Sequence, residues 1–293
     1  MLHHLNAHQT KPERVVIVGS SGFVGQSLVQ KLSRHNLPVL CIGRKDLDFT
    51  APEAFQELAK LLNPSDSLIF LAAITPDKGK GIDPLVANIQ IASTVSKAIE
   101  LVKIKHTVYF SSDAVYPISI PLINEESSAC AEDLYGIMHR TRELMMLSTG
   151  VPTAILRPTL IYGEGDTHNS YGPNRLRRAA HKDRSITLFG GGEEKRDHIY
   201  VEDVAELARL ALFHASTGTL NLATGSSISY FDLANQIASL FPFEVEVKLT
   251  ERKNPVTHRH FDITSIYKSF PEFQFTDRNT ALQLCQQDLA EAA

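Results

Sequence analysis

The chain has 293 residues, enough for one large hydrophobic core or two unequal ones. It carries 29 lysines and arginines against 33 aspartates and glutamates, so its formal net charge of -4 gives no basic field for DNA or RNA. The longest apolar runs fall far short of the roughly 20 residues that cross a bilayer, and no signal-peptide core is present. We therefore expect a cytoplasmic protein with neither a nucleic-acid nor a membrane partner.

Residues 1–12 are polar and precede the first apolar run. They are predicted to be a flexible leader, in spite of the histidines His3, His4 and His8. Elsewhere the histidines show no metal-ligand spacing, and the three cysteines are widely separated. No metal site and no disulfide framework are predicted.

Residues 13–157 alternate β-branched runs with amphipathic helical segments, which predicts an α/β fold with a Rossmann-type doubly wound parallel sheet. Strands are expected at 14–18, 39–42, 67–72, 107–111 and 153–156. Between them, helices are expected from residue 23 to about 36, up to about residue 62, and from residue 83 onward. A capping box of Thr50 and Glu53 is expected to open the second of these helices.

After Arg157 the pattern loosens into loops rich in glycine, proline and arginine. Residues 158–293 are predicted to form mainly a smaller, interleaved α/β domain that binds substrate. Segments at about 196–224 are expected to return to the Rossmann core, with a helix at about 204–214 and a strand at 219–223. A further helix is expected near 231–240.

A glycine-rich turn follows the first predicted strand, in the order Gly19, Ser21, Gly22, Phe23, Val24, Gly25. Gly19 can make the turn, Gly22 lets backbone approach a pyrophosphate, and Gly25 allows close packing of the helix. The phosphates would rest on the free N–H groups at the start of the helix. This position in the first βαβ unit predicts an NAD(P) site.

The second predicted strand ends in Gly43, Arg44 and Lys45, where a carboxylate would usually hold the ribose of NAD. A guanidinium suits the 2′-phosphate of NADP, so NADP is slightly favoured over NAD.

Hydroxyl and acidic groups follow the fourth predicted strand, at Ser112 and Asp113, where open α/β sheets bind ligands. Downstream, Tyr135 and His139 lie one helical turn apart on a single face. A hydroxyl at this strand end can hydrogen-bond a substrate oxygen.

Together these motifs resemble the extended short-chain dehydrogenase/reductases, in particular the NAD(P)-dependent epimerases and dehydratases of nucleoside-diphosphate sugars. The resemblance covers nearly the whole chain. It rests on the glycine turn, Leu71-Ala72-Ala73, Asn88, the Ser-Ser-x-x-Val-Tyr strand end at 111–116, Leu156-Arg157-Pro158 through Gly163, residues 190–204, Asn221 through Gly225, and residues 261–265.

The resemblance implies that Ser112 polarises the sugar oxygen and that Tyr135 moves the proton during hydride transfer. It also implies which further residues contact the cofactor and the substrate, and that the protein forms a homodimer. Further cofactor contacts are Asp48, Leu71, Ala72, Ala73, Asn88, Tyr135, His139 and Pro158. Substrate contacts are Ser112, Asp113, Arg196 for the diphosphate, and Asn174 and Arg175 as weaker candidates.

The chain departs from the family at His139, where a lysine is expected. A free tyrosine has a pKa of about 10, so ionisation near neutrality needs stabilisation from a neighbouring charge. A protonated His139 could supply it, although imidazole with a free pKa of about 6.5 is only partly charged. Two interpretations follow, namely an enzyme tuned by His139 and a catalytically impaired NAD(P)-binding sensor.

Asp113 and Ala114 narrow the reaction. By the resemblance, 4,6-dehydratases have a glutamate and double-epimerising reductases a cysteine at the position of Ala114. The remaining choices are 4-epimerisation and 4-keto reduction of a nucleoside-diphosphate sugar, with reduction of a small non-nucleotide ketone as a competitor. Asp113 is either part of the site or a cap of the following turn.

Overall fold

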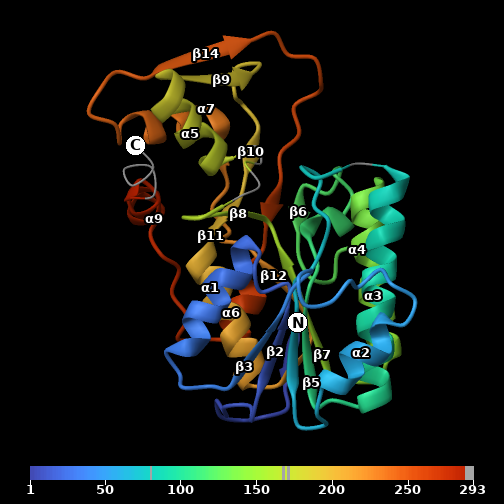
Figure 1. Ribbon diagram of the computed structural model, residues 1–293. Helices are drawn as coiled ribbons and strands as arrows, with labels where there is room; N and C mark the ends of the chain where they lie inside the picture. The colour runs from blue at the N-terminus through green and yellow to red at the C-terminus, as the bar shows by residue number, and fades with distance from the viewer. Residues whose placement is uncertain (80, 167–168, 170–171, 288–293) are drawn as a thin grey trace.

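The computed structural model describes residues 1–79, 81–166, 169 and 172–287. A seven-stranded sheet with strand order β3-β2-β4-β5-β7-β12-β1 forms its centre (Figure 1). These strands are β1 (Leu2–His4), β2 (Val15–Val18), β3 (Val39–Ile42), β4 (Ser67–Phe70), β5 (His106–Phe110), β7 (Thr153–Pro158) and β12 (Ser216–Leu222). Every pair is parallel except β1 with β12. Because strands are added in opposite directions from β2 and β4, the predicted doubly wound Rossmann-type sheet is confirmed.

Helices cover both faces of this sheet (Figure 1). On one face lie α1 (Phe23–Ser33) and α6 (Val201–Phe213), and on the other lie α2 (Ala54–Leu61), α3 (Ile82–Val102) and α4 (Leu134–Ser148). In β2, Val15 and Ile17 join the core on the α1 side, whereas Val16 and Val18 join the core on the α3 side. Side chains of a strand alternate between faces, so a strand covered on both sides is apolar throughout.

The predicted flexible leader is wrong, because residues 2–4 form β1 at the edge of the sheet. Leu2 pairs with Gly218 in antiparallel register. The His4 ring lies 2.8 Å from the Ser216 Oγ through Nδ1 and 2.9 Å from the Ser269 carbonyl through Nε2. A three-residue strand that pairs more than 200 residues away leaves no periodic pattern in the sequence.

A second lobe with its own apolar core lies beyond the carboxyl ends of the central strands (Figure 1). Its main elements are α5 (Pro173–Asp183), β9 (Ser185–Phe189), α7 (Tyr230–Ala238), β14 (Glu246–Thr250) and α9 (Arg278–Leu284). Shorter elements are η1 (Asp113–Val115), β6 (Leu122–Ile123), β8 (Leu160–Tyr162), β10 (Lys195–Arg196), β11 (His198–Tyr200), β13 (Ile228–Ser229), β15 (His260–Phe261) and α8 (Thr264–Ser269). The division into two domains at residue 158 stays a prediction. Helix α6 and strand β12, which lie in the segments expected to return to the Rossmann core, pack with the central sheet.

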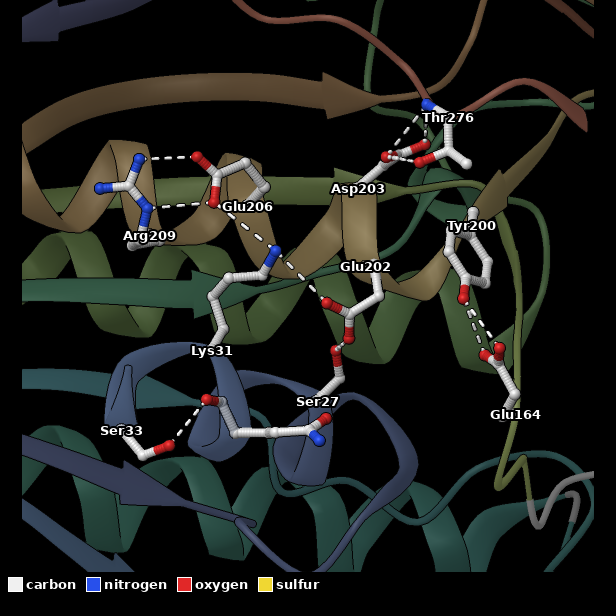
Figure 2. A network of polar contacts seen from close by, with 11 residues as sticks. Ser27, Lys31, Ser33, Glu164, Tyr200, Glu202, Asp203, Glu206, Arg209 and Thr276 are labelled. Carbon is white, nitrogen blue, oxygen red and sulfur yellow. Dashed lines mark hydrogen bonds and ion pairs between the residues drawn. The ribbon is translucent and has the colours of Figure 1, made fainter. Parts of the chain in front are cut away.

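Polar contacts fix α6 against α1 and against the chain before α9 (Figure 2). Glu202 accepts a hydrogen bond from the Ser27 hydroxyl at 2.5 Å and lies 3.3 Å from the Lys31 ammonium. Asp203 accepts from the Thr276 hydroxyl at 2.7 Å and from its N–H. Asp203 is therefore a structural residue.

The predicted capping box is not formed. The N–H and hydroxyl of Thr50 donate to the Asp48 Oδ1 at 3.0 and 2.7 Å, and α2 begins at Ala54 without a side-chain cap. In a capping box the Glu53 carboxylate would accept from the Thr50 N–H, and here Asp48 accepts from that N–H instead, so the local turn replaces the cap.

Helix α3 is long and apolar enough, by length and composition alone, to cross a membrane. In this fold its residues Ala92, Val95 and Ile99 are buried between the sheet and the neighbouring helices. It therefore has the place of a core helix.

Candidate active site

A cavity of about 750 Å³ opens where β2, β4, β5 and β7 end and the second lobe begins. Most of the predicted site residues line it. They are Gly19, Ser21, Gly22, Phe23, Val24, Gly25, Arg44, Asp48, Leu71, Ala72, Ala73, Ser112, Asp113, Tyr135, His139, Pro158 and Asn174. The topology thus brings together residues that lie up to 155 positions apart, at the point where the strand order reverses.

The glycine turn is tightly packed against the loop after β4. Gly19 has a φ of +96°, and a Cβ there would lie 2.6 Å from the Ala72 nitrogen. A Cβ on Gly25 would lie 2.5 Å from the Gly19 oxygen, so its close contact is with the turn itself. A Cβ on Gly22 would meet only the Gly19 oxygen, at 3.4 Å, and Gly22 begins α1 without a side-chain cap. The N-terminus of α1 therefore faces the cavity, and no capping side chain among the described residues covers its N–H groups.

At the end of β3, a cationic side chain lines the cavity, and the carboxylates near it accept hydrogen bonds from the chain itself. Arg44 is exposed, lines the cavity, and forms no hydrogen bond or ion pair with any residue that the structure describes. The Asp46 carboxylate accepts from the Gly43 N–H at 2.8 Å, and Asp48 accepts from Thr50. The Asp48 contact lowers the pKa of that carboxyl, which keeps it ionised.

Asn88 does not line the main cavity, and its contact with the cofactor stays a prediction. Its side-chain oxygen accepts from the Ile74 N–H at 2.9 Å, and its amide donates to the Ile74 carbonyl at 2.9 Å. Since residues 71–74 do line the cavity, Asn88 positions that wall from behind.

Ser112 and Asp113 follow β5 and lie beside the second lobe. The Ser112 Oγ accepts from the Ala114 N–H at 3.1 Å, so Ser112, not Asp113, caps η1. The Asp113 carboxylate instead lies 3.1 Å from the Arg259 Nε. Burial raises the pKa of Asp113, and Arg259 opposes this rise.

A buried ionic network supports this strand end from below. The Arg157 guanidinium donates twice to the Glu143 carboxylate, at 2.7 Å each, and once to the Tyr116 hydroxyl. Ser111 donates to Glu143 at 2.6 Å, and Tyr116 donates to Asn221. These groups satisfy one another's hydrogen bonds and charges, and they thereby fix the positions of β5, β7, β12 and α4 relative to one another.

Tyr135 lies in the first turn of α4, which Asp133 caps through the Gly136 N–H at 2.8 Å. A Cβ on Gly136 would lie 2.1 Å from the Ala114 carbonyl oxygen, so glycine lets the helix approach the Ser112 turn. Burial raises the pKa of Tyr135 to about 12, whereas the charge of Arg142 and the Ser112 hydroxyl lower it.

His139 is buried, and its ring stands edge-on to that of Tyr135 with centroids 4.7 Å apart. Its Nδ1 lies 2.9 Å from the Tyr109 hydroxyl, and its Nε2 has no partner within the described part of the chain. Burial and the charge of Arg142 hold its pKa well below the ordinary value. Burial therefore favours the neutral imidazole, and the assistance that a protonated His139 would give Tyr135 stays a prediction.

The predicted substrate contacts are distributed unevenly. Asn174 lines the cavity, but its amide donates to Asp166 at 2.8 Å and accepts from the Gly163 N–H. Arg196 donates to the Thr257 hydroxyl at 2.9 Å and is not among the cavity-lining residues. Arg175 is exposed on α5 and also lies outside the lining.

Two arginines at the site were not found from the sequence. Arg259 reaches Asp113 from a loop about 146 positions away, with no local pattern to mark it. Arg142 lies seven residues after Tyr135 on α4, a spacing of two helical turns that places both on one face. That spacing was a readable signal.

The model of the NAD dependent epimerase/dehydratase family matches residues 15–223, and the chain belongs to this family. Over 259 residues the chain is 25% identical to the uncharacterized UDP-glucose epimerase YtcB of Bacillus subtilis, covering 78% of this chain and 82% of that protein. Over 308 residues it is 23% identical to a probable GDP-L-fucose synthase of Drosophila melanogaster, covering 92% and 95%.

Solved structures confirm the fold. A GDP-L-fucose synthetase from Naegleria fowleri bound to NADP has a TM-score of 0.85 and 17% identity, covering 98% of this chain and 95% of that one. A UDP-N-acetylglucosamine 4-epimerase from Methanobrevibacter ruminantium M1 has a TM-score of 0.84 and 22% identity, covering 97% and 100%.

Proposed function

We propose that the protein is an NAD(P)-dependent enzyme that acts on a nucleoside-diphosphate sugar, by 4-epimerisation or by reduction of a 4-keto sugar. The supporting observation is that Ser112, Tyr135 and the glycine turn line one cavity of about 750 Å³. This size lies within the roughly 300 to 1,000 Å³ that is usual for ligand sites. The names of the relatives favour the same class of substrate.

The residues present fit a pyridine dinucleotide. The uncapped start of α1 offers N–H groups and a positive dipole end to a pyrophosphate. At the other end of the cavity, the buried Nε2 of His139 lacks a partner, and a ligand hydroxyl there would satisfy it.

The chain's own residues handle the proton. A bound NAD(P) supplies the acceptor or donor of hydride. When the sugar alcohol is oxidised, hydride leaves the carbon and the proton leaves its oxygen for the Tyr135 phenolate, and reduction reverses both transfers. The Ser112 hydroxyl hydrogen-bonds that oxygen. Ala114 lines the cavity beside Asp113 and cannot exchange a proton, which favours simple hydride transfer over elimination.

Turnover tests this proposal. Native mass spectrometry would identify any retained nucleotide sugar, and UDP- and GDP-sugars would then be assayed for epimers and for NAD(P)H absorbance. We expect Tyr135→Phe to lower kcat by about 10² to 10⁴. Tyr267→Phe, at a tyrosine that is 44% exposed, should have no effect. Dinucleotide binding without turnover on the whole panel would instead favour the noncatalytic sensor.

NADP is the cofactor that the ribose end favours, because Arg44 lines the cavity and has no partner among the residues that the structure describes. Calorimetry should show that Arg44→Ala weakens NADP binding by about tenfold or more and leaves NAD binding unchanged, since a charged hydrogen bond contributes about 1.5 to 3 kcal/mol. Lys45→Ala, next to it and outside the cavity lining, is the control. Equal losses for both dinucleotides would contradict the NADP preference.

A cytoplasmic homodimer completes the proposal. Helices α3 and α4 lie side by side (Figure 1). They expose large apolar side chains, among them Ile82, Leu101, Leu144 and Leu147. Contiguous exposed apolar surface is typical of an interface. Light scattering should give twice the chain mass, and Leu144→Asp should give the monomer.

A further inference from the structure

Proton exchange at Tyr135 requires a nearby positive charge, and His139 does not supply one. The imidazole is fixed through Nδ1 at 2.9 Å from the Tyr109 hydroxyl and is buried. Both burial and the neighbouring guanidinium keep it neutral. The cation of this site must therefore be another group.

Arg142 is a cation in the interior without a carboxylate partner. Its side chain is 1% exposed, and its guanidinium lies 4.5 Å from the centroid of the Phe70 ring. Nη2 donates to the Ala72 carbonyl at 2.6 Å, and Nη1 lies 3.4 Å from the Asn88 oxygen. No carboxylate lies within 4 Å of it in the part of the chain that the structure describes.

We infer that Arg142 is a positioning residue for the proposed reaction, whose buried, unpaired charge stabilises the Tyr135 phenolate across the neutral ring of His139. The inference rests on the proposed function. Tyr135, His139 and Arg142 share one face of α4, so the charge reaches the phenol through protein rather than through solvent. In such a medium a charge acts more strongly than in water.

The other groups around the phenol act against ionisation or are already engaged. Asp113 from η1 and Asp77 from the loop after β4 raise the pKa of Tyr135, and Arg142 is the strongest group that lowers it. Arg259 is committed to Asp113 at 3.1 Å. On the far side of Arg142, the Tyr109 phenol is itself neutral, because burial raises its pKa.

A site-specific titration tests the inference without substrate. Tyr135 is replaced by 3,5-difluorotyrosine, whose phenol is more acidic, and its ionisation is followed by ¹⁹F NMR. We expect Arg142→Gln to move the midpoint upward by about one pH unit or more, the usual effect of removing a close opposite charge. Arg142→Lys should leave it nearly unchanged. Arg140→Gln is the matched control, because Arg140 is partly exposed and pairs with Glu143.

A second variant separates charge from packing. His139→Lys combined with Arg142→Gln moves the cation by one turn and keeps the total charge of the cluster. This double variant should titrate like the original protein, and it also serves if Arg142→Gln alone fails to fold. An Arg142→Gln midpoint equal to that of the original protein would overturn the inference. If the single variant does not fold, a double-variant midpoint about one pH unit or more above that of the original protein would overturn it.

The kinetic readout distinguishes the two proposals. In an active enzyme, Arg142→Gln should shift the acid limb of the kcat profile upward by the same amount and lower kcat about tenfold at pH 7, with KM little changed. Absence of turnover in the original protein refutes the proposed function but leaves the ¹⁹F result intact. Normal turnover with an unmoved titration refutes only the role of Arg142.

Discussion

Two buried arginines occupy neighbouring parts of this core, and they differ in how their charge is balanced. Arg157 lies 2.7 Å from the Glu143 carboxylate and donates to it twice. Arg142, next to Glu143 on α4, contacts a backbone carbonyl and aromatic rings instead. A carboxylate at contact distance cancels a charge locally, so Arg157 serves structure. An unpaired charge acts on its surroundings, which is why Arg142 influences Tyr135 and His139.

The largest effect expected from this contrast is on Arg157. Replacement of Arg157 by Met leaves the Glu143 carboxylate buried without its main partner, and breaking a buried pair costs about 3 to 5 kcal/mol. Urea unfolding should show a loss of that size. A loss below about 1 kcal/mol would mean that the network does not stabilise the fold.

A second effect concerns pH and Glu143. Burial raises the pKa of Glu143, but Arg157 and Ser111 outweigh it, so the folded-state value lies below the ordinary one. The stabilisation is therefore complete above about pH 4.3, the unfolded value, and is lost as pH falls further. Glu143→Gln should cost about 2 to 3 kcal/mol at pH 7, and its deficit should shrink in acid. A deficit independent of pH would contradict this assignment.

Arg142→Met should change the free energy of unfolding by no more than about 1 kcal/mol. Relief of the desolvation penalty of an unpaired charge offsets the lost hydrogen bond to Ala72. Thermal and urea unfolding would measure this. A loss as large as that of Arg157→Met would erase the contrast between the two arginines.

The smallest effect is expected for Arg140, which also reaches Glu143, at 2.9 Å, but whose side chain is 37% exposed. Exposed ion pairs contribute at most about 1 kcal/mol. Arg140→Gln should lower the unfolding free energy by less than about 0.5 kcal/mol. A larger loss would show that the number of partners, not burial, sets the strength of the network.

Much of the fold was predictable because its signals are local. The alternation of apolar runs placed β3 at its observed bounds, and glycine spacing located the turn before α1. The errors arose where tertiary contacts or competing local bonds decide. The edge strand β1 depends on a distant partner, and Asp48 captured the donors of the expected cap.

For the site, the sequence predicted which residues line the cavity better than it predicted their charge and burial. Ser112, Tyr135 and His139 were correctly placed around one cavity, since each lies at a strand end or on one helix face. The charge of His139 was not predictable, because it depends on burial and on a guanidinium that its own helix carries. The burial of Arg142 between Phe70 and Tyr109 likewise exists only in the assembled fold.

The short strand β1 has a consequence for handling the protein. It pairs with Ser216–Gly218, the first three residues of β12, and so covers that part of the outer edge of the main sheet. Unprotected margins recruit strands from other molecules and promote aggregation. Fusions or truncations near Leu2 thus risk insolubility even though they lie far from the chemistry.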